Sequence, residues 1–118
     1  MNIESVREYC LSLKGCEESL PFDEQTLVFK VMGKIFIMMS LERQPPQFNF
    51  KALPEKGLEY REKYPTVLPG YHSNKKHWNT VILDQSVPEV ELQKWITDSY
   101  HLIIESLPKY KQKEFWAS

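Results

Sequence analysis

A predicted hairpin in the first half of the chain constrains the fold more than any other feature. Residues 26–32 and 35–41 are both rich in β-branched and aromatic side chains, and only Gly33-Lys34 separates them. Two such runs joined by a two-residue spacer that contains glycine predict antiparallel strands connected by a tight turn. With Gly33-Lys34 as the loop, Phe29 is expected to face Met38 across the pair.

Both faces of this hairpin are unusually apolar. Val28, Ile35, Ile37 and Met39 are expected on the outer face, which is the side away from the helices. An antiparallel sheet with one face in water alternates more cleanly between apolar and polar residues. The outer face is therefore either partly covered or used for contact with a partner.

Three further strand patterns follow the hairpin. Residues 47–51 alternate strictly between polar and apolar side chains, which predicts a strand with Phe48 and Phe50 in the core. A brief strand near residues 67–72 and a firmer one over about residues 77–83 come later in the chain.

Helical spacing of apolar residues predicts three helices. The first spans about Asn2 to Lys14 with an asparagine N-cap, and the second is a short helix between Pro54 and Pro65. The third begins at a capping-box pattern, Ser86 to Glu89, and ends near Leu107. The basic, aromatic tail from Lys109 to Trp116 is either a mobile arm or a final turn docked on the sheet.

The order of elements is therefore α-β-β-β-α-β-β-α. A chain of 118 residues has the usual size of one domain, so a single domain over residues 1–118 is expected. Runs of strands, rather than strands alternating with helices, predict an α+β fold. We expect a two-layer sandwich, in which an antiparallel sheet of about five strands carries helices on one face.

The charges are unevenly placed along the chain. The net charge of −1 argues against a strong general attraction to nucleic acid. However, the mainly helical residues 1–24 and 84–105 each carry a net charge of −4, whereas residues 25–51, predicted as strands, carry +3. A sheet with helices over one face would then have an acidic side and a basic side. The alternative is a solvated surface with ordinary variation in charge.

The stretch from Tyr64 to Asp84 concentrates aromatic residues, two of the three histidines and a lysine pair. Its residues 75–78, Lys-Lys-His-Trp, offer cations, a titratable ring and a stacking face, which are groups that bind phosphates and bases. If Val81 and Leu83 point into the core, the period of two places Trp78 on the opposite face, where its ring is expected to be partly exposed. Alternatively, Trp78 covers the edge of the core and the lysines are simply solvated.

Several segments together resemble the MmcQ/YjbR family of small bacterial proteins. They are Phe29 to Phe36, Pro69 to Val81, Ser99-Tyr100 and Leu107 to Lys109, and the most specific part is Asn74-Lys75-Lys76-His77-Trp78. This resemblance implies a frataxin/CyaY-like α+β fold, whose sheet bears two hairpin wings, and a role in binding DNA. It implies no reaction.

The leading hypothesis is a non-enzymatic DNA-binding protein that uses a basic sheet face. The residues expected to contact nucleic acid are Lys30, Lys34, Arg43, Lys51, Tyr71, His72, Asn74, Lys75, Lys76, His77 and Trp78. One alternative is a protein-interaction adaptor that uses the apolar outer face of the hairpin. Another is an enzyme or small-ligand site formed by Tyr71, His72 and His77.

No catalytic group, metal, cofactor or membrane contact is expected. The histidines match no standard metal-ligand spacing even with Cys10 included, and the sequence contains no catalytic triad order or phosphate-binding glycine loop. No apolar run approaches the roughly 18 residues of a membrane span, and the first residues lack the features of a signal peptide. We therefore expect a cytoplasmic protein with free thiols at Cys10 and Cys16. A monomer is expected rather than an obligate oligomer, with a protein partner as the alternative.

Overall fold

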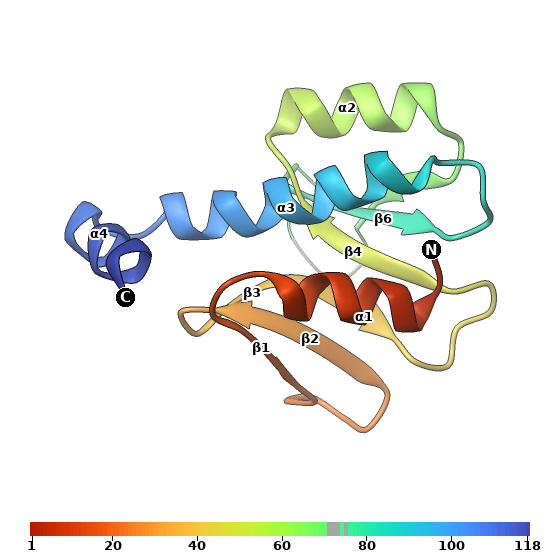
Figure 1. The fold of residues 1–118 in the computed structure, drawn as a ribbon. Helices are drawn as coiled ribbons and strands as arrows, with labels where there is room; N and C mark the ends of the chain where they lie inside the picture. Colours follow the sequence, from red (N-terminus) through yellow and green to blue (C-terminus); the bar gives the residue numbers. More distant parts are fainter. Residues whose placement is uncertain (71–73, 75) are drawn as a thin grey trace.

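A computed structural model of the chain describes residues 1–70, 74 and 76–118 (Figure 1). The elements are α1 (Ile3–Ser12), β1 (Cys16–Ser19), β2 (Thr26–Val31), β3 (Lys34–Ser40), β4 (Gln47–Lys51), α2 (Pro54–Lys63), β5 (Val67–Pro69), β6 (Trp78–Ile82), α3 (Glu89–Glu105) and α4 (Lys109–Ala117). The six strands form one sheet in the order β1-β2-β3-β4-β6-β5, in which all neighbours are antiparallel. The predicted α+β fold with an antiparallel sheet is confirmed.

The core lies between the sheet and the helices α1, α2 and α3, which pack on one face. Val6 and Cys10 come from α1, and Trp95 from α3 is only 1% exposed. Phe48 and Phe50 of β4 point into this core, as their alternation predicted. One cluster of buried side chains thus joins the two layers.

Two elements were missed in the sequence analysis, which counted about five strands and three helices. β1 has the sequence Cys-Glu-Glu-Ser, and its strand conformation comes from pairing with β2, where Glu17 faces Lys30. α4 stands beyond the end of α3, away from the sheet (Figure 1). Lys14 holds it by donating hydrogen bonds to the carbonyls of Trp116 and Ser118, at 3.2 and 2.7 Å. The tail is therefore helical and is not docked on the sheet.

The predicted loop of the hairpin was wrong by one residue. The turn residues are Met32 and Gly33, with φ of 51° and 80°, because a two-residue hairpin loop of this type needs positive φ at both positions. Consequently Val31 faces Lys34 and Lys30 faces Ile35, and Phe29 does not face Met38 as predicted.

The register then shifts at a β-bulge in β3. Phe29 faces Ile37 but Lys30 faces Ile35, so Phe36 has no partner on β2. A bulge of this kind turns two successive side chains to one side, and both Phe36 and Ile37 are fully buried. Ile37 and Met39 thus belong to the helix-side core, and their predicted place on an apolar outer face was wrong.

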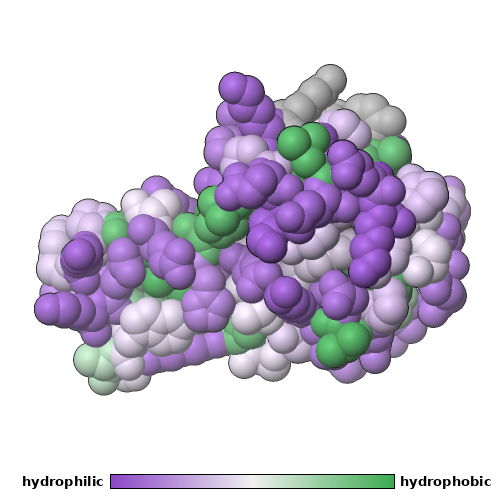
Figure 2. All heavy atoms as spheres, turned by 90° about the horizontal axis from the view of Figure 1, so that it is seen from above, coloured by the Kyte–Doolittle hydropathy of each residue, from purple (hydrophilic) through white to green (hydrophobic). Residues whose placement is uncertain are grey.

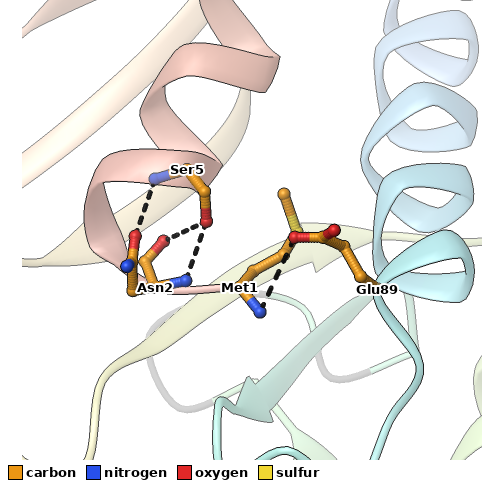
Figure 3. A network of polar contacts seen from close by, with 4 residues as sticks. All are labelled: Met1, Asn2, Ser5 and Glu89. Atoms are coloured by element: carbon orange, nitrogen blue, oxygen red, sulfur yellow. Dashed lines mark hydrogen bonds and ion pairs between the residues drawn. The ribbon is translucent and has the colours of Figure 1, made fainter.

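The starts of α1 and α3 lie side by side (Figure 3). Asn2 caps α1 as predicted, because its Oδ1 accepts the Ser5 N–H at 2.8 Å and the Ser5 Oγ accepts the Asn2 N–H at 2.8 Å. The Met1 amino nitrogen lies 3.9 Å from Glu89 Oε1. The capping box predicted for α3 was wrong, because Pro88 is the N-cap and the hydroxyl of Ser86 bonds to Asp84 instead.

The last two strands position the residues of greatest interest. β6 pairs with β4 on one side and with β5 on the other, so that Val81 faces both Phe48 and Val67. Val81 and Leu83 are buried as expected.

In the described residues, no helix is long and apolar enough to cross a membrane.

Candidate nucleic-acid interface

We call the sheet surface away from α1, α2 and α3 the open face. Its middle row consists of the cross-strand neighbours Val28, Met38, Asn49, Thr80 and Leu68. Val28 is buried but is not part of the helix-side core. The Thr80 hydroxyl donates a 2.6 Å hydrogen bond to Asn49 Oδ1, which ties β6 to β4 on this face. The open face is therefore an ordered strand surface.

Lys51 and Trp78 are direct cross-strand partners on the open face. Side chains alternate between the two faces along each strand. Because Phe50 on β4 and Val81 on β6 are buried against the helices, Lys51 and Trp78 lie on the opposite face. Directly opposed residues have Cβ atoms about 4.5–5.5 Å apart. Trp78 is half-buried, which confirms the prediction of a partly exposed ring on this face.

Two further lysines lie toward the same end of the sheet. β2 and β4 finish where β3 begins, which brings Lys30, Lys34 and Lys51 to one end. Lys34 faces Val31 of the helix-side core, however, so it lies on the other face of the sheet, and its predicted place beside Lys30 was wrong. From Lys30 on β2 to Trp78 on β6 there are three strand spacings, or roughly 14 Å. Glu17 faces Lys30 from β1 and places one carboxylate among these cations.

Arg43 does not join this group. It follows β3 at the opposite end of the sheet, where it borders a depression of about 140 Å³ with Thr26, Ser40 and Gln47. Of the basic residues predicted in this part of the chain, only Lys30 and Lys51 therefore share the open face with Trp78.

The turn before β6 is shaped by Asn74. Its carbonyl accepts the N–H groups of His77 and Trp78, at 3.1 and 2.9 Å, and its Oδ1 accepts the N–H of Lys76 at 2.9 Å. Lys76 is exposed and lies two residues before Trp78. His77 is half-buried, and its carbonyl accepts a hydrogen bond from the N–H of Ala52 at 2.8 Å. The predicted site residues Tyr71, His72 and Lys75 lie outside the described residues.

A second candidate site, on the helix side, was missed by sequence reasoning. A cavity of about 230 Å³ opens between α2 and α3. Its lining residues are Phe50, Lys51, Ala52, Leu53, Lys56, Tyr60, Lys94, Trp95, Asp98, His101, Leu102 and Glu105. Of these, only Lys51 was predicted as a site residue. The pattern that could have revealed the site is the polar spacing of residues 94, 98, 101 and 105 along one side of α3.

The electrostatics of this cavity involve Tyr60 and Asp98. Burial raises the pKa of the Tyr60 hydroxyl, and the negative charges of Asp98, Glu91 and Glu59 raise it further. No group of three His, Cys, Asp or Glu side chains in the described part of the chain is arranged to hold a metal ion.

Comparison with known proteins identifies the family. The YjbR family model matches residues 11–102. The chain is 39% identical to the uncharacterised protein YbdF of Escherichia coli O157:H7 over 93% of this chain and 90% of that one. It is 32% identical to the uncharacterised protein YjbR of Escherichia coli K12 over 96% of both chains.

Solved structures agree with this assignment. The crystal structure of Deinococcus radiodurans protein DR2400, of the DUF419 family, is 37% identical and superposes with a TM-score of 0.91 over 97% of this chain and 87% of that one. A Pseudomonas syringae protein that is 25% identical gives a TM-score of 0.74 over 86% of this chain and 98% of that one. These comparisons show the family and the fold. The protein belongs to the MmcQ/YjbR family.

Proposed function

We propose that the protein is a non-enzymatic DNA-binding module that holds single-stranded DNA on the open face. The observation that carries this proposal is the pairing of Lys51 with Trp78. A lysine ammonium beside a partly exposed indole offers a phosphate contact and a stacking plane at neighbouring positions. Proteins that bind single strands without strong sequence preference combine these two groups.

The lysines around this pair extend the surface. Lys30 continues it onto β2, and Lys76 lies just before β6. Phosphate contacts by lysine supply affinity that falls as salt releases the counterions. Because Glu17 opposes Lys30 and the net charge of the chain is −1, binding is expected to be modest and strongly dependent on salt.

Fluorescence anisotropy of a labelled oligothymidine tests this proposal. The double variant Lys51→Gln/Lys76→Gln should weaken binding by about tenfold or more, and the slope of log K against log salt should become shallower by about 1 to 2. Glu17→Gln should act in the opposite direction and tighten binding, because it removes the carboxylate that faces Lys30.

The matched control is Lys109→Gln/Lys111→Gln, which removes the same charge from α4, away from the sheet. Equal losses for the two double variants would show a general charge effect and reject the open face as the binding surface. Tighter binding to duplex DNA of the same length would reject stacking of bases on Trp78.

A further inference from the structure

The cavity between α2 and α3 has a rigid aromatic floor. The ring of Trp95 stacks against Phe50, with centroids 5.2 Å apart and planes inclined by 19°. It also stacks against Tyr60, with centroids 4.5 Å apart and planes inclined by 27°. These residues come from α3, β4 and α2, so the floor is fixed by the packing of three elements. Phe50 and Trp95 are 0% and 1% exposed, so they support the floor from within, and the apolar surface that a ligand can contact lies on the partly exposed Tyr60 and Leu102.

Charged groups of both signs border this floor. Lys94 and Asp98 line the cavity from α3 and are one helical turn apart, about 6 Å along the axis. No ion pair joins them, although both residues are described, and a lysine placed before an acidic residue is the weaker order for such a pair. In contrast, Lys56 lies 3.6 Å from Glu59 and is partly neutralised on the surface. Lys94 and Asp98 are therefore available to opposite charges of a ligand.

The floor also contains a polar group that the fold leaves unsatisfied. The indole Nε1 of Trp95 is buried and has no hydrogen-bond partner in the described structure. Most buried polar groups in folded proteins are paired, and an exception calls for a specific explanation. Trp95 lines the cavity and stacks on Tyr60, so the resonance of this N–H should shift when a ligand binds there.

The size and surroundings of the cavity restrict the ligand. A volume of about 230 Å³ is below the ~300–1,000 Å³ of sites for drug-sized molecules, so only a small ligand fits. Figure 2 views the molecule from the α2 side and shows hydrophobic groups at the surface where the arm formed by the end of α3 and α4 leaves the body. A purely anionic ligand would meet Asp98 and Glu105, and a purely cationic ligand would meet Lys56 and Lys94.

We propose that the cleft between α2 and α3 binds a small zwitterion with an apolar body, of the free amino acid class. Lys94 binds the carboxylate, Asp98 binds the ammonium group, and the apolar side chain packs against Tyr60 and Leu102, with Trp95 directly beneath Tyr60. This site opens on the helix side of the sheet, and its proposed ligand contacts do not include Trp78 or Lys51, although Lys51 also borders the cavity.

Titration followed by two-dimensional NMR of the indole N–H groups tests the site, with L-phenylalanine as the probe. The variants Trp78→Phe and Trp116→Phe identify the signals of these two residues, and the remaining indole signal belongs to Trp95. The buried Trp95 itself is not substituted. We expect a saturable shift of the Trp95 signal with L-phenylalanine. 3-Phenylpropionate lacks the ammonium group and 2-phenylethylamine lacks the carboxylate, and each should bind at least tenfold more weakly.

The variants Lys94→Gln and Asp98→Asn should each weaken L-phenylalanine binding at least tenfold. The matched controls Lys111→Gln and Glu114→Gln on α4 should leave binding unchanged. If the Trp95 shift still rose linearly at about 10 mM L-phenylalanine, without saturation, the binding would be too weak for a specific site, and the proposal would be overturned. Equal binding by Lys94→Gln, Asp98→Asn and the controls would also overturn it. If either analogue bound as tightly as the amino acid, the zwitterion assignment would be wrong.

Discussion

The hydroxyl of Ser99 on α3 donates a 2.7 Å hydrogen bond to the carbonyl of Phe36 at the bulge of β3. The same oxygen accepts the N–H of Lys51, at the end of β4, over 2.8 Å. Phe36 has no register partner on β2 or β4, so a side chain from the helix layer satisfies the backbone where the ladder is interrupted. One fully buried hydroxyl thus connects α3 to two strands.

Ser99→Ala should lower the free energy of unfolding by about 1–3 kcal/mol, because it leaves the buried carbonyl of Phe36 and the partly buried N–H of Lys51 without a partner. Urea denaturation measures this change. The control is Ser106→Ala, whose exposed hydroxyl bonds only to the carbonyl of Ile103 within its own helix. Equal effects of the two substitutions would contradict the role assigned to Ser99.

Gly57 on α2 packs directly against the fully buried side chain of Asn79 on β6. A Cβ at position 57 would lie 3.0 Å from Asn79 Oδ1 and 3.2 Å from its Nδ2. Alanine favours a helix over glycine by about 1 kcal/mol, but overpacking costs about 1–3 kcal/mol, and a buried asparagine has little room to move away. Gly57→Ala should therefore destabilise the protein.

A double-mutant cycle with Asn79→Ala tests the cause. In the Asn79→Ala background the added methyl group has space, so Gly57→Ala should become neutral or stabilising in urea denaturation. Additive effects of the two substitutions would show that the contact with Asn79 is not the reason.

The parts of the structure that follow from local patterns were predictable from the sequence. The alternation in residues 47–51 assigns Phe48 and Phe50 to the core, and the same period of two in β6 places Trp78 beside Lys51 on the open face. β1 could not be recognised, because it is polar and adopts a strand conformation only through its pairing with β2.

The cavity was not predictable for a related reason. Tyr60 and Trp95 lie far apart in the chain and meet only when α2 and α3 pack beside each other on the sheet. The polar spacing on α3 is also typical of any solvated helix face. A site formed between two elements therefore needed the tertiary structure to be seen.

The hairpin turn holds Met32 at φ of 51°, a conformation that costs free energy for a residue with a large side chain. Met32→Asn creates the Asn-Gly pair preferred in such turns, and it should stabilise the protein by about 0.5–1 kcal/mol. Met32→Val should destabilise it, because β-branched residues tolerate positive φ poorly. Thermal melts of both variants measure these shifts, and identical melting temperatures would show that the turn does not limit stability.

Both cysteines are free, and their thiols are protected by the fold. Burial raises the pKa of Cys16 to about 11, and the charges of Glu18 and Glu17 contribute further. Burial also raises the pKa of the Cys10 thiol. Because the thiolate is the reactive form, a rise from 9.0 to about 11 leaves roughly 100-fold less of it at pH 8.

Native protein should therefore react very slowly with iodoacetamide at pH 8, and the rate should rise as the pH approaches 11. Protein unfolded in urea should react at both cysteines at the ordinary rate of a thiol. Mass spectrometry counts the alkylated sites. Rapid labelling of Cys16 in the native state at pH 8 would contradict the raised pKa.

Substitution of Trp78 distinguishes a binding surface from structural packing. The ring is half-buried and lies opposite Lys51, on the face away from the helices. Removal of a stacking aromatic residue from a single-strand site costs roughly 1–3 kcal/mol of binding free energy. Trp78→Ala should therefore weaken oligothymidine binding by about 5- to 150-fold, measured by fluorescence anisotropy.

Trp78→Ala should lower the free energy of unfolding by much less than the roughly 3–5 kcal/mol typical of truncating a buried core aromatic residue. Trp116→Ala is the matched control, since Trp116 is 47% exposed on α4, outside the sheet. It removes an indole that is more exposed than that of Trp78 and lies outside the open face, and it should leave DNA binding unchanged. A large fall in the melting temperature of Trp78→Ala without a specific loss of DNA affinity would assign Trp78 to packing, because the open face would then lack its stacking residue.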